Sequence, residues 1–259
     1  MKILPVLSTV LALLMFACQS DSMASTIIRV AAQEASEPKF IAISQQGKPA
    51  IGGICVDIMR ALEKVDPELK FVGDQTWQPR IRIDAGMNAG NIDAICGVQR
   101  ITRNTSQYHF LDTVLFSVSY LLAVRADDDI DIQNWDDIRK LGDKGVILAL
   151  HGFGIVDILE KMGGLKVDSG ATSSLSNLNK LMAGRGRFYC HRSPGIKLSI
   201  QQAGLAKKIR LLAKPQLSEK FYMALSKTVP ADQAKRISNA LVALESSGEL
   251  RRIFEKYPE

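Results

Sequence analysis

The sequence predicts an α/β protein built as two lobes, on three observations. The 259 residues are 46% hydrophobic and 23% charged, which is enough apolar material for one large or two medium domains. From residue 27 onward, short apolar runs alternate with amphipathic helical patterns, which is typical of a mostly parallel sheet with helices on both faces. Two extended segments, 117–127 and 219–227, divide this alternation into two series. We therefore expect each series to form one lobe.

The first series begins with a short buried strand. Its predicted strands are 26–33, 68–73 and 92–98, and its predicted helices are 56–65 and 77–90. In the first helix, Ile58, Leu62 and Val65 form one apolar stripe, and Gly90 ends the second helix.

The second series repeats the alternation. It has predicted strands at 145–150 and 187–190, and predicted helices at 135–141, 154–162, 173–184 and 193–204, before a closing helix at 231–257. If both extended segments cross between lobes, lobe 2 (119–220) is inserted into lobe 1 (25–118 and 221–259). Ligands of such folds usually bind in the cleft between lobes, beyond the carboxyl ends of strands.

Residues 1–24 have the pattern of a secretory signal peptide. Lys2 precedes an apolar run of about 15 residues, shorter than the roughly 20 that span a bilayer. Cleavage after Ala24 and lipidation at Cys18 both fit, although Phe16 is bulky for a lipidation motif. Because no later run has spanning length, we expect an exported protein that is not integral to the membrane.

Charge and histidine placement argue against two classes of partner. The net charge is +6, but the basic residues are scattered, so we expect a solvated basic surface and no nucleic acid. His109, His151 and His191 are far apart and lack neighbouring ligand residues, so we expect no metal and no cofactor.

Three cysteines follow the leader. Cys55 precedes a helix and Cys96 ends a strand, so these two could meet at one sheet edge and form a disulfide, leaving Cys190 free. Three separate buried thiols fit the sequence equally well.

Five motifs together resemble the bacterial family 3 solute-binding proteins, the amino-acid-type receptors of ABC importers. They are GGICVDIMRAL, GNIDAICGVQRIT, YLLAV, FYMALSK and SSGELRRIFEKY, and the resemblance covers about residues 27–257. The resemblance implies a type II periplasmic-binding-protein-like fold, with two α/β lobes joined by a two-segment hinge. It also implies a periplasmic location and a membrane permease as partner.

The sequence departs from the family's amino-acid site at two places. Members hold the ligand carboxylate with an arginine in a Thr-x-x-Arg motif, but counting from Thr102 places Thr105 there, with Arg100 and Arg103 nearby. Members hold the ammonium with an aspartate of the second lobe, but residues 191–193 contain no acid. We therefore expect the ligand to carry a carboxylate and not to bind as an α-amino acid usually does.

The candidate ligand-binding residues follow strands or begin helices. Arg100 can pair with a carboxylate, with Thr102 beside it, and the glycine-flanked turn after residue 150 can hold an anion or offer an apolar wall. The predicted set is Glu34, Trp77, Arg80, Arg100, Thr102, His151, Gly152, Phe153, Tyr189 and Arg192. For each there is a plain alternative: surface arginines, a solvated loop acid, a tight turn, or aromatic side chains that only seal a core.

Three functions fit the sequence. The leading one is a non-catalytic, monomeric receptor that closes by hinge motion on a small polar solute with a carboxylate. A dehydratase-like periplasmic enzyme and a ligand sensor are the alternatives. The sequence has no GxSxG motif and no acid pair at readable spacing, so we expect no enzyme activity.

Overall fold

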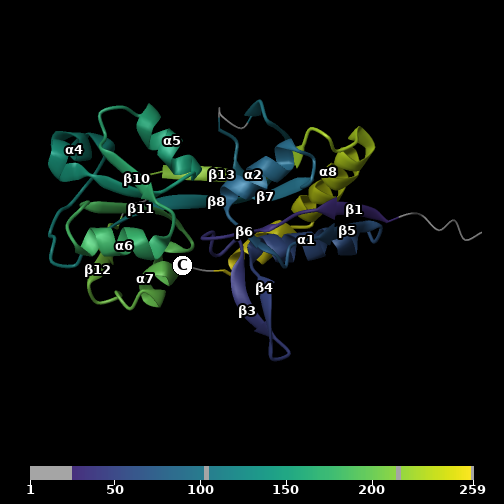
Figure 1. Cartoon of the computed structure of the whole chain (residues 1–259), viewed down its shortest axis with the longest axis horizontal. Helices are drawn as coiled ribbons and strands as arrows, with labels where there is room; N and C mark the ends of the chain where they lie inside the picture. Colours follow the sequence, from purple (N-terminus) through teal and green to yellow (C-terminus); the bar gives the residue numbers. More distant parts are fainter. Residues whose placement is uncertain (1–24, 102–104, 214–216, 258–259) are drawn as a thin grey trace, which may run out of the picture.

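The structure is a computed structural model that describes residues 25–101, 105–213 and 217–257. The predicted leader, Cys18 and Thr102 lie outside these ranges. Figure 1 shows two groups of elements. The first group surrounds α1 (Ile54–Val65), α2 (Arg80–Asn88), α8 (Ala231–Ser246) and α9 (Glu249–Glu255), and the second group surrounds α4 (Trp135–Lys140), α5 (Gly154–Lys161), α6 (Ser174–Met182) and α7 (Ile196–Gln202).

The main sheet runs through both groups. Its strand order is β10-β9-β11-β8-β13-β7, and β12 also pairs with β8. The bounds are β7 Ala94–Gln99, β8 Tyr108–Arg125, β9 Ile147–Leu150, β10 Val167–Ala171, β11 Phe188–Ser193, β12 Ile209–Leu211 and β13 Leu217–Ser226. Only the β10-β9 and β9-β11 pairs are parallel. The sheet is therefore mixed, which corrects the expected mostly parallel sheet, because β8 and β13 are antiparallel to all of their neighbours.

Two long strands join the two groups. The 18 residues of β8 pair with β13 from Tyr108 to Tyr120, and with β11 and β12 further on. In Figure 1, β8 and β13 run between the groups. The expected extended segment at 117–127 thus begins nine residues earlier than predicted. The lobe boundaries given above stay a prediction.

The first group also contains three small two-stranded sheets. They are β1 (Thr26–Arg29) with β5 (Leu69–Val72), β2 (Ala32–Gln33) with β6 (Trp77–Gln78), and the hairpin of β3 (Ile41–Gln45) with β4 (Lys48–Gly52). Trp77 therefore lies in a strand and not at the start of a helix, because Pro79 keeps the residue before it extended and α2 begins only at Arg80. The predicted closing helix is two helices, broken at Gly248, which has a φ of +72°.

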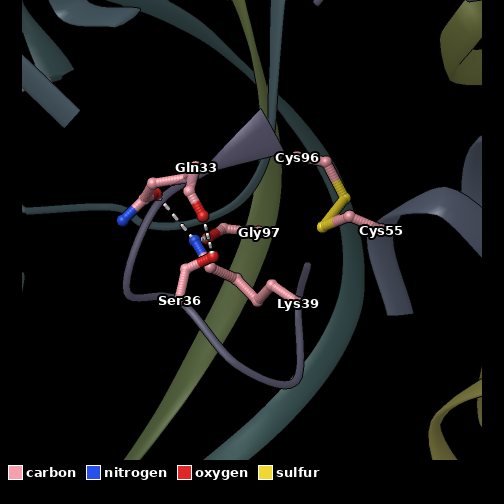
Figure 2. Close-up of a disulfide and its surroundings, with 6 residues drawn as sticks. All are labelled: Gln33, Ser36, Lys39, Cys55, Cys96 and Gly97. Atoms are coloured by element: carbon pink, nitrogen blue, oxygen red, sulfur yellow. Dashed lines mark hydrogen bonds between the residues drawn. A yellow bond between two sulfur atoms is a disulfide. The ribbon is translucent and has the colours of Figure 1, made fainter. Parts of the chain in front are cut away.

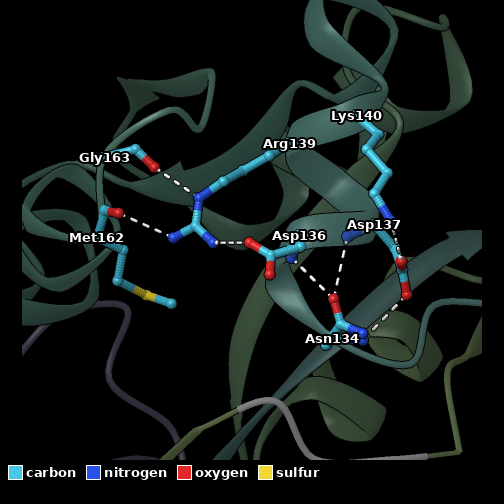
Figure 3. A network of polar contacts seen from close by, with 7 residues as sticks. All are labelled: Asn134, Asp136, Asp137, Arg139, Lys140, Met162 and Gly163. Atoms are coloured by element: carbon cyan, nitrogen blue, oxygen red, sulfur yellow. Dashed lines mark hydrogen bonds and ion pairs between the residues drawn. The ribbon is translucent and has the colours of Figure 1, made fainter.

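A polar network fixes the first helix of the second group (Figure 3). The side chain of Asn134 accepts from the backbone N–H groups of Asp136 and Asp137, and the Asp137 carboxylate accepts from the backbone of Asn134. Arg139 pairs with Asp136 at 2.5 Å and donates to the carbonyls of Met162 and Gly163. The last turn of α4 is thereby tied to the end of α5, and the 3₁₀ turn η1 (Gly142–Gly145) leads on to β9.

Within the described ranges, no helix combines the length and the apolar character required to cross a bilayer.

Candidate functional site

A small cavity lies where the two groups meet. Its volume is about 30 Å³. The first group and the crossing strands contribute Gln33, Lys39, Arg80, Gly97, Val98, Gln99, Ile101, Tyr120 and Phe221, and the second group contributes Gly152, Phe153, Gly154 and Arg192. The cavity thus has walls from both groups, as expected of an interlobe ligand site.

Four of the predicted site residues line this cavity: Arg80, Gly152, Phe153 and Arg192. Thr102 lies outside the described residues. The other five do not line the cavity.

Arg100 does not line this cavity, and its role in ligand binding stays a prediction. Its Nη2 donates to the carbonyl of Leu111 at 3.2 Å and to Asp112 at 3.0 Å. Its guanidinium also lies over the rings of Phe110 and Tyr222, 5.4 and 4.7 Å from their centroids. Cation–π contacts and an ion pair on β8 and β13 hold this side chain away from the cavity.

The remaining four predicted residues have structural surroundings. Glu34, Trp77 and His151 are exposed, and Nδ1 of His151 lies 3.3 Å from the carbonyl of Ser169. Tyr189 is fully buried in an apolar cluster with Leu148 and others of the second group. A role of these four side chains in ligand binding stays a prediction.

Lys39 is the site residue that the sequence analysis missed. Its side chain is buried, with only 3% of the residue exposed. Its Nζ donates to Oε1 of Gln33 and to the carbonyl of Gly97, both at 2.9 Å (Figure 2). No carboxylate among the described residues pairs with it. Burial, followed by the charges of Arg192 and Arg80, lowers the pKa of Lys39 well below its ordinary value, against smaller raising effects of Asp84 and Glu37.

The loop that carries Lys39 is fixed at several points. The carbonyls of Pro38 and Lys39 accept from the first backbone N–H groups of α1, those of Ile54 and Cys55, both at 3.0 Å. Cys55 forms a disulfide with Cys96 in the middle of β7, with a Cα–Cα distance of 5.8 Å, while Cys190 is a buried free thiol. Figure 2 shows this disulfide beside the Lys39 loop.

Gly97 makes the close approach possible. Its φ of +71° favours glycine, and a Cβ there would lie 2.8 Å from Cδ of Lys39 and 3.2 Å from Sγ of Cys55. The Lys39 stem therefore packs directly on the backbone of β7.

Arg192 lies at the end of β11 in the second group, and it lines the same cavity as Lys39. It is 2% exposed, and its Nη2 donates to the carbonyl of Glu37 at 3.0 Å. Its guanidinium lies over Phe153, 5.2 Å from the ring centroid, and its buried Nε has no partner among the described residues. Burial lowers the pKa of Arg192.

The third cation of the cavity is compensated. Nε of Arg80 pairs with Asp84 at 2.7 Å, and the same carboxylate oxygen accepts from the Tyr108 hydroxyl at 2.6 Å. Nearby, the Tyr120 hydroxyl donates to Oε1 of Gln99 at 3.2 Å. The cavity thus contains two buried cations without an acid partner and no acidic lining residue. Such charges are costly unless an anion joins them.

The sequence matches the family model of the bacterial extracellular solute-binding proteins, family 3, over residues 28–259. The chain belongs to this family. A search of curated proteins gave no match.

Solved structures with a similar fold align with about nine-tenths of the chain. A probable amino-acid ABC transporter extracellular-binding protein, ytmK, from Bacillus subtilis is 15% identical, covers 90% of this chain and 97% of its own, and has a TM-score of 0.72. A mutant of ArgBP from T. maritima is 19% identical, with coverages of 89% and 94% and a TM-score of 0.69. A histidine kinase sensor domain with similarity to periplasmic binding proteins is 19% identical, with coverages of 90% and 96% and a TM-score of 0.72. These likenesses show a shared type II periplasmic-binding fold.

Of the two buried cations in this family 3 protein, Arg192 is among the predicted site residues and Lys39 is not. The signal available for Lys39 was weak: a lone basic residue between Pro38 and Phe40, in a segment without helical or strand period. Within the described ranges, no cluster of three His, Cys, Asp or Glu side chains has a metal-binding arrangement.

Proposed function

We propose that the protein is the solute receptor of an ABC importer, and that it closes around a small solute with a carboxylate. The observation that carries this proposal is the pair of buried cations, Lys39 and Arg192, on opposite walls of one cavity. A carboxylate can accept charge-assisted hydrogen bonds from both, which compensates charges that the protein leaves unpaired.

Contacts between the groups support a mechanism by closure. Arg192 reaches across to the carbonyl of Glu37, and a Cβ on Gly154 would lie 2.3 Å from Oε1 of Gln99. A volume of about 30 Å³ leaves little room for a solute in this arrangement. The solute would enter when the groups separate about β8 and β13, and its contacts with both walls would favour closure.

The titles of the neighbours support import of a small solute. The B. subtilis neighbour is described as a probable amino-acid ABC transporter protein. We propose the same role here for a periplasmic monomer, released by cleavage after Ala24 or anchored at Cys18, that delivers its solute to a membrane permease.

Sensing is the second candidate function, and the histidine kinase sensor domain among the neighbours favours it. Solute uptake by cells that lack the gene separates the two roles. A receptor for import is needed for uptake at low solute concentration, whereas a sensor changes gene expression without being required for transport.

The binding proposal is tested on protein that has been unfolded, dialysed and refolded to remove bound solute. A panel of carboxylates should raise its melting temperature, because a ligand that binds only the folded state stabilises it. Arg192→Met should abolish this shift, because it removes the guanidinium that would bind the carboxylate. The variant should still fold, because an apolar side chain of similar volume replaces an unpaired buried cation and preserves the packing. Arg185→Met, at an exposed arginine of the second group, is the matched control and should leave the shift unchanged. A shift that is equal in both variants would contradict the proposed site.

A further inference from the structure

We infer that the solute is a small dicarboxylic acid without an ammonium group, an inference that rests on the proposed function. It follows from a comparison of hydrogen-bond donors and acceptors around the cavity. The unpaired groups are donors with positive charge, and the acceptors that an ammonium would need already bond to the protein's own donors.

The donors come from both walls. The Lys39 ammonium has three N–H groups, and the described residues accept from it twice. The Arg192 guanidinium has five N–H groups, and the described residues accept from it once, at the carbonyl of Glu37. Each cation therefore retains capacity for a carboxylate, one on each side of the cavity.

Each acceptor of this set already bonds to one of the protein's own donors. Oε1 of Gln33 and the carbonyl of Gly97 accept from Lys39, whose ammonium occupies the place where a ligand ammonium could bind. Oε1 of Gln99 accepts from Tyr120, and the carbonyl of Glu37 accepts from Arg192. A ligand ammonium would thus enter beside two cations and share acceptors that already bond to the protein's own donors.

Acidic side chains do not change this balance. No Asp or Glu lines the cavity. Asp84 pairs with Arg80, and Glu219 interacts with Gln99 from outside the lining. Glu37 contributes its carbonyl to the contact with Arg192 and lies outside the lining. The two uncompensated cations therefore favour a solute with two negative charges.

The test compares solutes that differ only in the ammonium group. Isothermal titration of the stripped protein is carried out with succinate against aspartate, and with glutarate against glutamate. In at least one pair, we expect the dicarboxylate to bind at least ten times more tightly than the amino acid of the same pair. An amino acid that binds as tightly or more tightly would overturn the inference and leave the proposed function intact.

Further titrations test whether both carboxylates are needed and whether an inorganic anion binds instead. Butyrate and valerate keep the chain and remove one carboxylate, and they should bind ten times or more weakly than succinate and glutarate. In Lys39→Met and Arg192→Met this preference for two carboxylates should disappear, whereas Lys39→Arg should retain part of it. Binding of sulfate or phosphate without any dicarboxylate would assign the site to an inorganic oxyanion and overturn the inference. Binding of none of these probes would contradict the proposed function itself.

Discussion

The ammonium of Lys39 is held by two uncharged oxygens in a buried site, with Arg192 and Arg80 close enough to lower its pKa. An anion bound beside Lys39 adds negative charge and should raise this pKa again. Ligand binding should therefore be coupled to the uptake of a proton.

The first prediction concerns this coupling. In a pH series below the ordinary pKa of lysine, the binding enthalpy of the solute should differ between MOPS and Tris, because the buffer supplies the proton and the two buffers have different ionisation enthalpies. In Lys39→Met the difference between the two binding enthalpies should vanish, even if the variant still binds the solute. Equal enthalpies in the two buffers for the unmodified protein would mean that Lys39 keeps one protonation state throughout.

The second prediction concerns His191, next to Arg192. Its Nε2 is buried without a partner among the described residues, and burial, followed by the charge of Arg192, lowers the pKa of His191 from 6.5 to about 3. The unfolded chain thus binds a proton between these pH values that the folded protein does not. The free energy of unfolding should fall as the pH drops through this window, by about 2–3 kcal/mol at pH 4.5 from His191 alone.

Urea unfolding of the protein and of His191→Gln, at pH 7 and pH 4.5, measures this contribution. The variant should lose about 2–3 kcal/mol less over the interval. Carboxylates whose pKa is lowered, such as Asp66 and Asp128, also weaken the protein in acid, but they do so in both proteins. Parallel pH profiles would contradict a neutral buried His191.

Among the elements, the junction of β7 with the Lys39 loop leaves no space for a side chain at Gly97. Gly97→Ala combines an unfavourable backbone conformation with contacts to Lys39, Phe116 and Cys55 that are shorter than 3.3 Å. The exposed Gly204 has a similar φ of +69° and nothing within 4 Å of a Cβ, so Gly204→Ala reports the backbone cost alone. In chemical denaturation, Gly97→Ala should lower the free energy of unfolding by about 1–3 kcal/mol more than Gly204→Ala does. Equal losses would show that the Lys39 stem moves away at little cost.

The disulfide joins the start of α1 to β7 and closes a loop with a sequence separation of 41. Loop-closure entropy predicts that Cys55→Ala/Cys96→Ala lowers the free energy of unfolding by about 4 kcal/mol. A reductant should destabilise the native protein and leave the double variant unchanged. Peptide mass spectrometry after alkylation of the unfolded protein without reductant should find Cys190 modified and Cys55 linked to Cys96. An alkylated Cys55 would contradict the disulfide in the exported protein.

The elements that could be predicted from the sequence are those with continuous burial. All six residues of β7 are buried and five of them are apolar or glycine, so they give a run that marks a strand. The six residues of β11 are also buried, but only residues 188–190 are apolar, so the sequence predicted only that first half. The β3–β4 hairpin is mostly exposed and contains Pro49, so it has neither a hydrophobic period nor a typical strand composition.

The site was less accessible to prediction. Arg100 follows a buried strand and Arg192 ends one, so the two have the same pattern in the sequence. Aromatic side chains of β8 and β13 hold Arg100 away from the cavity, and only the pairing of these distant strands brings those side chains to it. Lys39 is buried because Gly97 and Cys96, about 60 residues away, pack against its loop.

For the whole molecule, the fit between the groups depends on small residues at their contact. Gly154→Val should place its side chain against Gln99, which Tyr120 holds in place, and prevent the arrangement seen here. We expect a larger radius of gyration in small-angle X-ray scattering with solute present, and at least tenfold weaker binding. Glu160→Val puts the same residue type at an exposed position of the same helix and should change neither. A compact Gly154→Val with full affinity would show that closure does not need this contact.

The positions of the cysteines along the chain have a consequence for biogenesis. An exported polypeptide emerges with its N-terminal part first, so Cys55 and Cys96 both reach the oxidising compartment before Cys190. The native pair can therefore be oxidised while the third thiol is still behind the membrane. When Cys190 does arrive, Cys55 and Cys96 are already bonded to each other, and its strand then buries it in the core. The order of the three cysteines thus favours the pairing of Cys55 with Cys96 in a chain exported as proposed.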